Sequence, residues 1–264
     1  FVKAYVVNNK EIREKIILLN KYFIVLCMYK MKKNLNQKLI HLIEYYQLIN
    51  ADILFANSPI NRNVKKERTL DNSSKKKKLE KLKHSIKNIK NCELKKNANN
   101  LVFSDGNINS KIMLIGEGPG AQEDLEGLPF VGRAGKLLDK MLKSINLDRQ
   151  KVYISNVVNY RPPKNRKPTV EEIEKYYPFL KLHIEIINPK ILVLLGSTAL
   201  NAIIGNGKVI SKVRGKWIKK QIGNCHPYII ASFHPAFLMR QPDQKKLAWI
   251  DLKLIREKMK KLNF

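Results

Sequence analysis

Short apolar runs alternate with longer segments of helical periodicity in the part of the chain that follows residue 101. A brief apolar run bounded by turn residues is typical of a strand that is covered on both faces. The runs lie at residues 111–115, 152–158, 190–195 and 228–233. Helical spacing marks residues 134–145 and 170–187, and a basic helix is expected at 244–262. This alternation predicts an α/β fold with a central, mainly parallel sheet and helices on both faces.

A glycine-rich turn follows the first apolar run. Its glycines (Gly116, Gly118 and Gly120) carry no side chain, so the backbone can approach a ligand closely. An aromatic ring and several carboxylates lie in or soon after the turn, namely Phe130, Glu117, Glu123 and Asp124. Together they indicate a pocket at the carboxyl end of a strand. The segment lacks the G-x-G-x-x-G spacing of a dinucleotide-binding turn. It is not a Walker loop either, because no G-K-[ST] follows.

Polar residues also end two of the other runs. Asn156 lies in the run at 152–158, and His234 directly follows the run at 228–233. The motifs G-E-G-P-G…P-F-V-G-R-A-G, N-x-x-x-x-R-P-P-x-N-R-x-P-T and F-H-P-A-x-L-x-R-x-P occur in this order. They resemble those of the family-four uracil-DNA glycosylases of bacteria and archaea, and the resemblance runs from about residue 92 to the C-terminal helix.

The resemblance implies a three-layer α/β/α sandwich and a monofunctional uracil-DNA glycosylase. Such an enzyme hydrolyses the N-glycosidic bond of flipped-out deoxyuridine and thereby starts base-excision repair. Two alternatives stay open, a catalytically inactive nucleic-acid-binding relative of the same fold and a glycosylase for another deaminated base. The joint presence of Glu117, Phe130, Asn156 and His234 argues against the inactive relative.

Glu117 and His234 are the catalytic residues that the resemblance implies. Glu117 would orient the attacking water and offset positive charge on the sugar, and His234 would donate a hydrogen bond to uracil O2. A histidine before a proline is more often a structural loop residue, so that alternative is kept for His234.

Phe130, Asn156, Gly118 and Glu123 are the implied uracil-binding residues. Phe130 would stack on the base, unless it is a core residue. The Asn156 amide would pair with O4 and N3–H of uracil, whereas cytosine presents the opposite polarity; its alternative is a strand-end turn. Glu123 would exclude a thymine methyl, or it is a solvated loop carboxylate.

The net charge of +29, from 51 Lys and Arg against 22 Asp and Glu, indicates a polyanionic partner, although a compositional bias of the genome would also raise it. DNA contacts are expected from Arg133, Arg161, Arg166, Arg214, Lys216 and Arg240. Leu238 is expected to help fill the space left by the flipped base, or else to pack at the start of a helix.

Residues 1–90 differ in composition and are expected to form a basic, partly helical extension, followed by the catalytic domain at 91–264. Within the extension, residues 39–46 show helical spacing, and the Lys-rich segment 61–83 is expected to be a flexible linker or basic arm. Residues 1–30 are interpreted as a degraded or non-native leader, with Met31 as the expected start of the functional protein.

The apolar stretch at 16–28 is too short to span a membrane. Three cysteines argue against a secreted disulfide scaffold, so we expect a cytoplasmic protein. We also expect a monomer that acts on uracil-containing DNA, with replication or repair proteins as candidate partners.

The resembled family holds a four-iron, four-sulfur (4Fe-4S) cluster on four cysteines. By motif position the ligands fall here on Ile89, Cys92, Tyr160 and Tyr176, so Cys92 is the only one retained. Because such clusters are normally held by four thiolates, we expect no cofactor and no metal. We expect the two tyrosines to fill the vacated space with their hydroxyls toward solvent. The alternative is a 4Fe-4S cluster as in the wider family.

Overall fold

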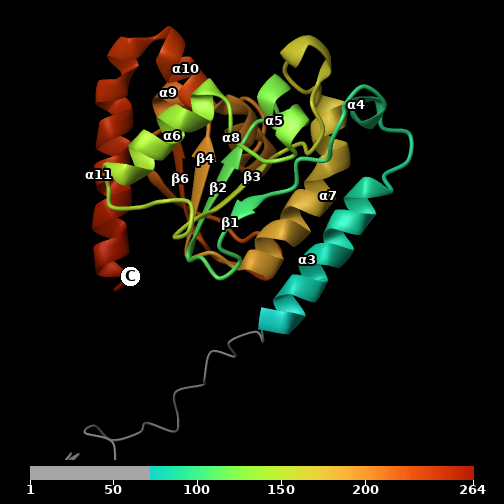
Figure 1. The fold of residues 1–264 in the computed structure, drawn as a ribbon. Helices are drawn as coiled ribbons and strands as arrows, with labels where there is room; N and C mark the ends of the chain where they lie inside the picture. Colours follow the sequence, from blue (N-terminus) through green and yellow to red (C-terminus); the bar gives the residue numbers. More distant parts are fainter. Residues whose placement is uncertain (1–71) are drawn as a thin grey trace, which may run out of the picture. The chain divides into compact units, whose positions relative to one another are not determined.

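The computed structural model describes residues 72–264, and within them the strands form one six-stranded sheet in the order β1-β3-β2-β4-β6-β5 (Figure 1). The central strands pair in parallel, namely β2 (Ile112–Gly116), β3 (Tyr153–Asn156), β4 (Ile191–Leu195) and β6 (Tyr228–Ser232). The short strands β1 (Asp105–Gly106) and β5 (Trp217–Lys219) pair antiparallel at the edges. The predicted α/β class with a mainly parallel central sheet is therefore confirmed.

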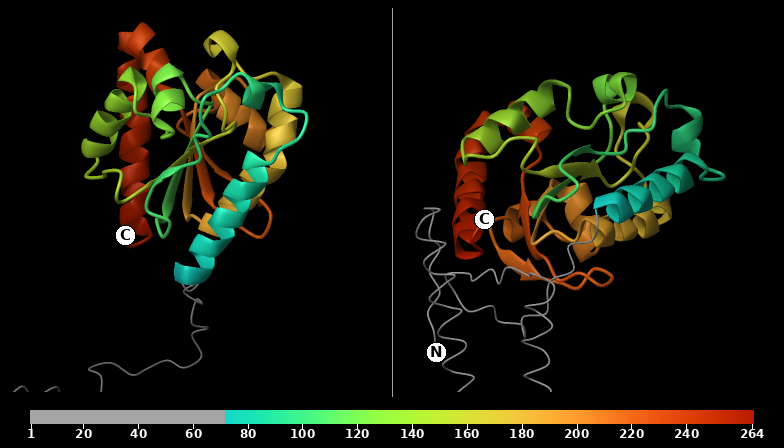
Figure 2. Two further views of the ribbon diagram at one scale, coloured as in Figure 1. Left: turned by 45° about the vertical axis from the view of Figure 1, so that its right-hand side comes forward. Right: turned by 60° about the horizontal axis from the view of Figure 1, so that its bottom comes forward.

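Alternate residues of the central strands face two different layers of helices (Figure 2). Ile112 and Leu114 pack with one layer, which contains α6 (Arg133–Lys143), α10 (Pro235–Arg240) and α11 (Lys245–Lys261). Met113 and Ile115 pack with the other, which contains α3 (Asn72–Lys87), α7 (Val170–Ile187) and α8 (Ser197–Ile204). Burial on both faces explains why each strand reads as a continuous apolar run.

Short helices connect these elements. They are α4 (Glu93–Lys96), α5 (Ala121–Glu126), α9 (Ile210–Val213) and the 3-10 helices η1 (Pro163–Asn165) and η2 (Pro242–Gln244). No helix within residues 72–264 is both long and apolar enough to cross a membrane.

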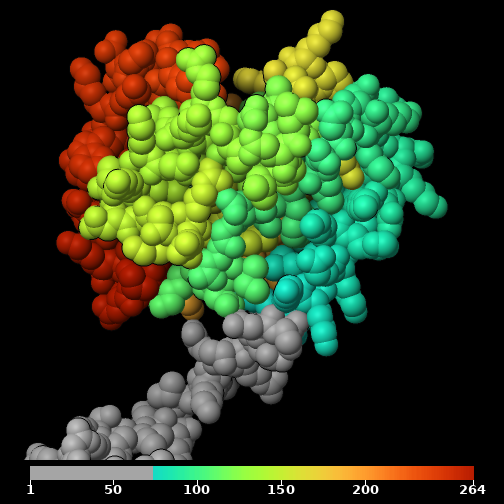
Figure 3. All heavy atoms as spheres, in the orientation of Figure 1, coloured from blue at the N-terminus to red at the C-terminus, as the bar shows by residue number. Residues whose placement is uncertain are grey.

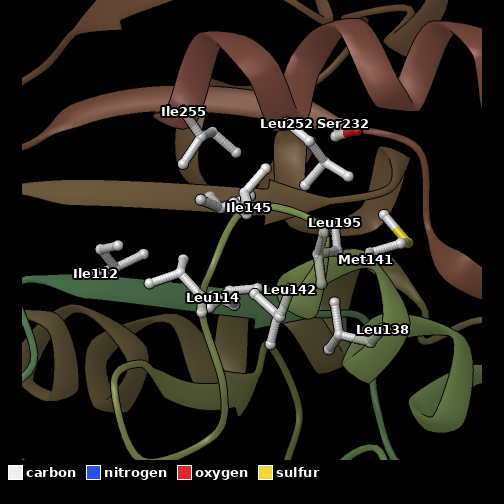
Figure 4. Close-up of a pocket in the computed structure, with 12 residues that line it drawn as sticks. Ile112, Leu114, Leu138, Met141, Leu142, Ile145, Leu195, Ser232, Leu252 and Ile255 are labelled. Carbon is white, nitrogen blue, oxygen red and sulfur yellow. The ribbon is translucent and has the colours of Figure 1, made fainter. Parts of the chain in front are cut away.

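A small cavity lies between α6, α11 and the sheet, and side chains from all three line it (Figure 4). The lining is apolar, with residues such as Leu114, Leu142 and Ile255, apart from Ser232. The Ser232 hydroxyl already donates a hydrogen bond to Asp251 at 2.7 Å. An apolar cavity of this kind stays dry, so we assign it to core packing.

Helix α3 corrects the prediction of a flexible linker through residue 83. Its Leu79, Leu82 and Ile86 are buried in the same core as α7, and the two helices lie side by side (Figures 1 and 2). The buried Lys75 ammonium donates to Ile187 O at 3.0 Å, and Ile187 is the last residue of α7. A cation at a helix C-terminus complements the helix dipole. Packed structure therefore extends to the N-terminal side of residue 91.

The predictions for residues 1–30, 39–46 and 61–71 lie outside the described residues.

Helix α7 has the bounds that the sequence predicts. The Thr169 hydroxyl accepts a hydrogen bond from Glu172 N at 3.2 Å, and the Glu172 carboxylate accepts one from Thr169 N at 2.8 Å. This reciprocal capping box satisfies two N–H groups at the helix start. It also anchors the end of the preceding loop, residues 161–169, to a rigid element.

Candidate active site

The carboxyl ends of the parallel strands meet at one edge of the sheet, at the top of Figure 1. Glu117 directly follows β2, Asn156 ends β3, and His234 follows β6 by two residues. The structure therefore brings these three predicted residues to the same edge, as parallel pairing requires.

Phe130 covers Gly116 beside Asn156. A Cβ atom added at Gly116 would lie 2.5 Å from Phe130 Cζ and 2.4 Å from Asn156 Oδ1, so only glycine leaves room for both side chains. The Phe130 ring also stacks on the His234 ring, with 5.5 Å between centroids and 28° between planes. Phe130, Asn156 and His234 thus form one cluster. Phe130 lies on a loop and is also buried in the core, at 5% exposure. Its stacking on a base stays a prediction.

Asn156 is 3% exposed, and its Oδ1 atom is buried without a hydrogen-bond partner in the structure. An unsatisfied buried acceptor costs about 1–3 kcal/mol. A ligand that offers an N–H group at this point would remove that cost. The orphaned oxygen is therefore the clearest sign that the cluster is built for a ligand.

His234 is held as a neutral imidazole. Burial, together with the nearby positive charge of Arg240, lowers the pKa of His234 to about 4. Its Nδ1 accepts a hydrogen bond from Ala236 N at 3.2 Å, at the N-terminus of α10. An accepting Nδ1 places the proton of the neutral ring on Nε2. His234 can therefore donate one hydrogen bond to a ligand without carrying charge.

Glu117 is half-buried, and its Oε2 accepts a hydrogen bond from the hydroxyl of Thr198. Thr198 lies in the first turn of α8, directly after β4. Sequence reasoning did not single out Thr198. A signal was available, because the residues after the 190–195 run must reach the same edge of the sheet.

The other carboxylates of the glycine-rich segment have structural contacts. Glu123 accepts hydrogen bonds from Gly120 N at 3.1 Å and from Gly132 N at 2.9 Å, so it joins the starts of α5 and α6. Its predicted role against a thymine methyl stays a prediction. Asp124 is fully buried and accepts from Asn99 N at 2.9 Å, so its expected place in the pocket is wrong.

Gly118 packs tightly against the segment that follows β3. A Cβ there would lie 2.7 Å from Val158 Cγ2, so the absent side chain makes room for protein packing. Contact of Gly118 with uracil stays a prediction.

Arg149 fixes the loop that carries Phe130, and sequence reasoning missed it. Its guanidinium donates to Pro129 O at 3.1 Å and also to Phe130 O, and it pairs with Asp105 at 2.7 Å and Asp139 at 2.8 Å. Phe130 has a left-handed backbone, with φ of 55°. For a bulky residue this conformation is strained, and the Arg149 contacts hold it in place.

Most of the predicted DNA-contacting residues are accessible. Arg133, Lys216 and Arg240 are exposed. Arg161 donates to Asn165 Oδ1 at 2.8 Å, and the exposed Arg166 pairs with Glu172 at 2.7 Å. The loop with η1 and the α10–α11 region, yellow and red in Figure 3, rise on either side of the site's edge.

Two residues predicted to contact DNA, Arg214 and Leu238, have structural contacts instead. The Arg214 side chain is 11% exposed and is paired with the buried Asp251, with 3.0 Å from Nε to Oδ2. Leu238 is 1% exposed and packs in the core with α6 and α11. Arg214 therefore stabilises the fold, and the helix-packing alternative holds for Leu238.

The positions of the family's cluster ligands come together in space. Cys92, Tyr160 and Tyr176 are buried in one core, and Ile89 packs against it. Cys92 Sγ lies 3.3 Å from the Tyr176 hydroxyl, so the expectation that this hydroxyl reaches solvent is wrong. Burial raises the pKa of Tyr176 and of Tyr160. One thiol, two phenols and an isoleucine do not fit a four-thiolate cluster. No group of three or more His, Cys, Asp or Glu within residues 72–264 is placed to hold a metal.

Comparison with known proteins agrees with this geometry. The profile of the "Uracil DNA glycosylase superfamily" matches residues 103–253. The chain is 46% identical over 156 residues to the type-4 uracil-DNA glycosylase of Thermotoga maritima, covering 59% of this chain and 80% of the relative. Relatives with the same name in Sulfurisphaera tokodaii and Archaeoglobus fulgidus are each 41% identical, covering 68% and 65% of this chain and 84% and 88% of their own lengths.

Proposed function

Because the chain belongs to the uracil DNA glycosylase superfamily, we propose that it is a monofunctional uracil-DNA glycosylase that starts base-excision repair. The observation that carries this proposal is the orphaned Oδ1 of Asn156 beside Phe130 and His234. A flat ring with an N–H group between two carbonyls matches that arrangement.

Recognition follows from the Asn156 amide. The deoxyuridine is flipped out of the duplex, at a cost of a few kcal/mol, so that its base reaches the site. Asn156 Oδ1 accepts from uracil N3–H, and Asn156 Nδ2 donates to O4. Cytosine has an acceptor at N3 and an amino group at C4, so it leaves the amide mismatched at a cost of about 1–3 kcal/mol. The Phe130 ring offers a face for stacking.

Bond cleavage uses His234 and Glu117. The bond from uracil N1 to sugar C1′ breaks, and its electron pair stays on uracil. The neutral His234 donates from Nε2 to uracil O2, where negative charge gathers; such a donor contributes about 3 kcal/mol. The Glu117 carboxylate offsets the positive charge on the sugar and orients a water, whose oxygen bonds to C1′. The water's proton passes to Glu117 and then to solvent, and the uracil anion is protonated on release.

DNA is held by basic residues around the site, namely the exposed Arg133, Arg166, Lys216 and Arg240 and the half-buried Arg161. Their phosphate contacts give affinity without sequence preference, as a scanning enzyme requires. We further propose that the protein acts in the cytoplasm as a monomer, alongside other repair or replication proteins.

The proposed enzyme works without an iron–sulfur cluster. Support comes from the donor set at the four ligand positions, where Cys92 is the only thiol and is close to the Tyr176 hydroxyl. Anaerobic purification followed by iron and sulfide analysis should find neither element in stoichiometric amount. Near-stoichiometric four-iron content would contradict this part of the proposal.

Release of free uracil from a uracil-containing oligonucleotide tests the main proposal. We expect an abasic site without added metal or nucleotide, and no release from a matched thymine oligonucleotide. Asn156→Ala serves as the matched inactive variant. If excess enzyme binds the uracil strand but never forms an abasic site, the protein is a binding relative. If it releases only another deaminated base, its substrate differs from the proposed one.

A further inference from the structure

The turn between β4 and α8 touches both candidate catalytic residues. β4 lies between β2 and β6 in the sheet, so its carboxyl end lies between the ends that carry Glu117 and His234. Gly196 has φ of 95°, and a Cβ there would lie 3.0 Å from His234 Cβ. Two residues later, Thr198 donates its hydroxyl hydrogen to Glu117 Oε2.

The Thr198 hydroxyl does not serve its own helix. A Ser or Thr at a helix start commonly caps it by accepting from a backbone N–H. In α8 the N-cap is Gly196, and no side-chain cap bond is formed. Thr198 is 7% exposed, and its one hydroxyl proton goes to a carboxylate on a different strand end. The hydroxyl therefore joins α8 to Glu117 and does not cap its own helix.

We propose that Thr198 is a positioning residue for Glu117, an inference that rests on the proposed function. A glutamate side chain has several rotatable bonds, and a buried hydroxyl bound to Oε2 selects one arrangement of them. With Oε2 engaged, Oε1 is the oxygen left for the attacking water. The N-terminus of α8 also favours a carboxylate at this point. Thr198 thus acts through Glu117 and does not itself touch the substrate.

Single-turnover uracil release with the full chain tests this, with enzyme in excess. T198V keeps the shape and removes the donor, and we expect a rate about 10- to 100-fold lower, as for loss of a hydrogen bond to a charged group. T198S should restore the rate to within about 3-fold of wild type, and affinity for uracil DNA should not change. S85A is the control, because it removes a side-chain hydroxyl that donates to Lys81 O at 3.0 Å on the exposed face of α3, away from Glu117 and the proposed DNA contacts.

A double-mutant comparison separates positioning from a general structural role. In a Glu117→Gln background, T198V should lower the remaining rate by less than about 2-fold, because the two residues act as one unit. Full additivity, or wild-type activity in T198V, would overturn the proposal. T198A carries the same expectation if T198V does not fold.

A readout independent of activity keeps the inference apart from the proposed function. The side-chain carboxyl ¹³C signal of Glu117, identified by its loss in Glu117→Gln, should move in T198V and stay near wild type in T198S. If wild type releases no uracil, the proposed function fails, but this signal still tests the contact. An unmoved signal in T198V would show that the contact does not exist in solution.

Discussion

Replacing Gly116 by alanine should disable the site while leaving most of the fold intact. The new Cβ would lie 2.4 Å from Asn156 Oδ1 and 2.5 Å from Phe130 Cζ, where ordinary contact needs about 3.4 Å or more. One or both side chains must therefore move by about 1 Å. A shift of that size in a catalytic arrangement can lower the rate about 100-fold.

Phe130 has little freedom to retreat from such a methyl group. Arg149 holds its carbonyl, and a Cβ at Gly135 would lie 1.6 Å from Phe130 O, which shows how closely α6 backs the loop. We therefore expect the Asn156 amide to yield, and with it the recognition of uracil. Overpacking of this kind also costs about 1–3 kcal/mol of stability.

The measurement is single-turnover uracil release, paired with thermal unfolding. Gly207→Ala is the control, because a Cβ there meets nothing within 4 Å. Gly207 has a positive φ, of 79°, whereas Gly116 does not, so the control carries backbone strain without a clash. The control should lose some stability and keep its rate. A Gly116→Ala rate within about 3-fold of wild type would refute the account of a site packed around Gly116.

Three further predictions concern recognition, pH and chain length. Asn156→Asp should lower uracil excision, because a second acceptor replaces the amide donor to O4; an unchanged rate would remove Asn156 from recognition. Burial lowers the pKa of His183 to about 3 and that of His234 to about 4, so the unfolded state binds more protons below about pH 6.5. The free energy of unfolding should therefore be fully retained above about pH 6.5 and fall as the pH drops toward 4. Denaturant titrations at several pH values would measure this. A free energy of unfolding that does not change with pH would contradict the claim that both histidines are neutral in the folded protein. A truncation that begins at residue 91 removes Leu79, Leu82 and Ile86 from the core and should lower the melting temperature markedly. An unchanged melting temperature would show that α3 contributes nothing to stability.

Strands and helices could be predicted where buried residues recur at regular intervals along the sequence. The strands could be recognised because both faces are covered, which produces continuous apolar runs. Glu117, Asn156 and His234 could be grouped because the ends of parallel strands share an edge. Their chemical roles came from motif resemblance rather than from patterning.

The failures share a different cause, which is contact between distant residues. In α3 an apolar stripe lies among many lysines. One of them, Lys75, is buried because it donates to Ile187 O, which lies 112 residues later in the chain. Arg214 was expected to be free for DNA, but Asp251 engages it 37 residues later. The Arg149 contact with the Phe130 loop likewise has no local signature.

The buried contact between Cys92 and Tyr176 also bears on how the protein matures. In the proposed iron-free form, this part of the core closes on side chains that the chain already carries. Completion of the fold then needs no delivery of iron or sulfide by assembly machinery. The supply of active protein would follow its synthesis alone, and it would persist under iron starvation or oxidative conditions that destroy exposed clusters.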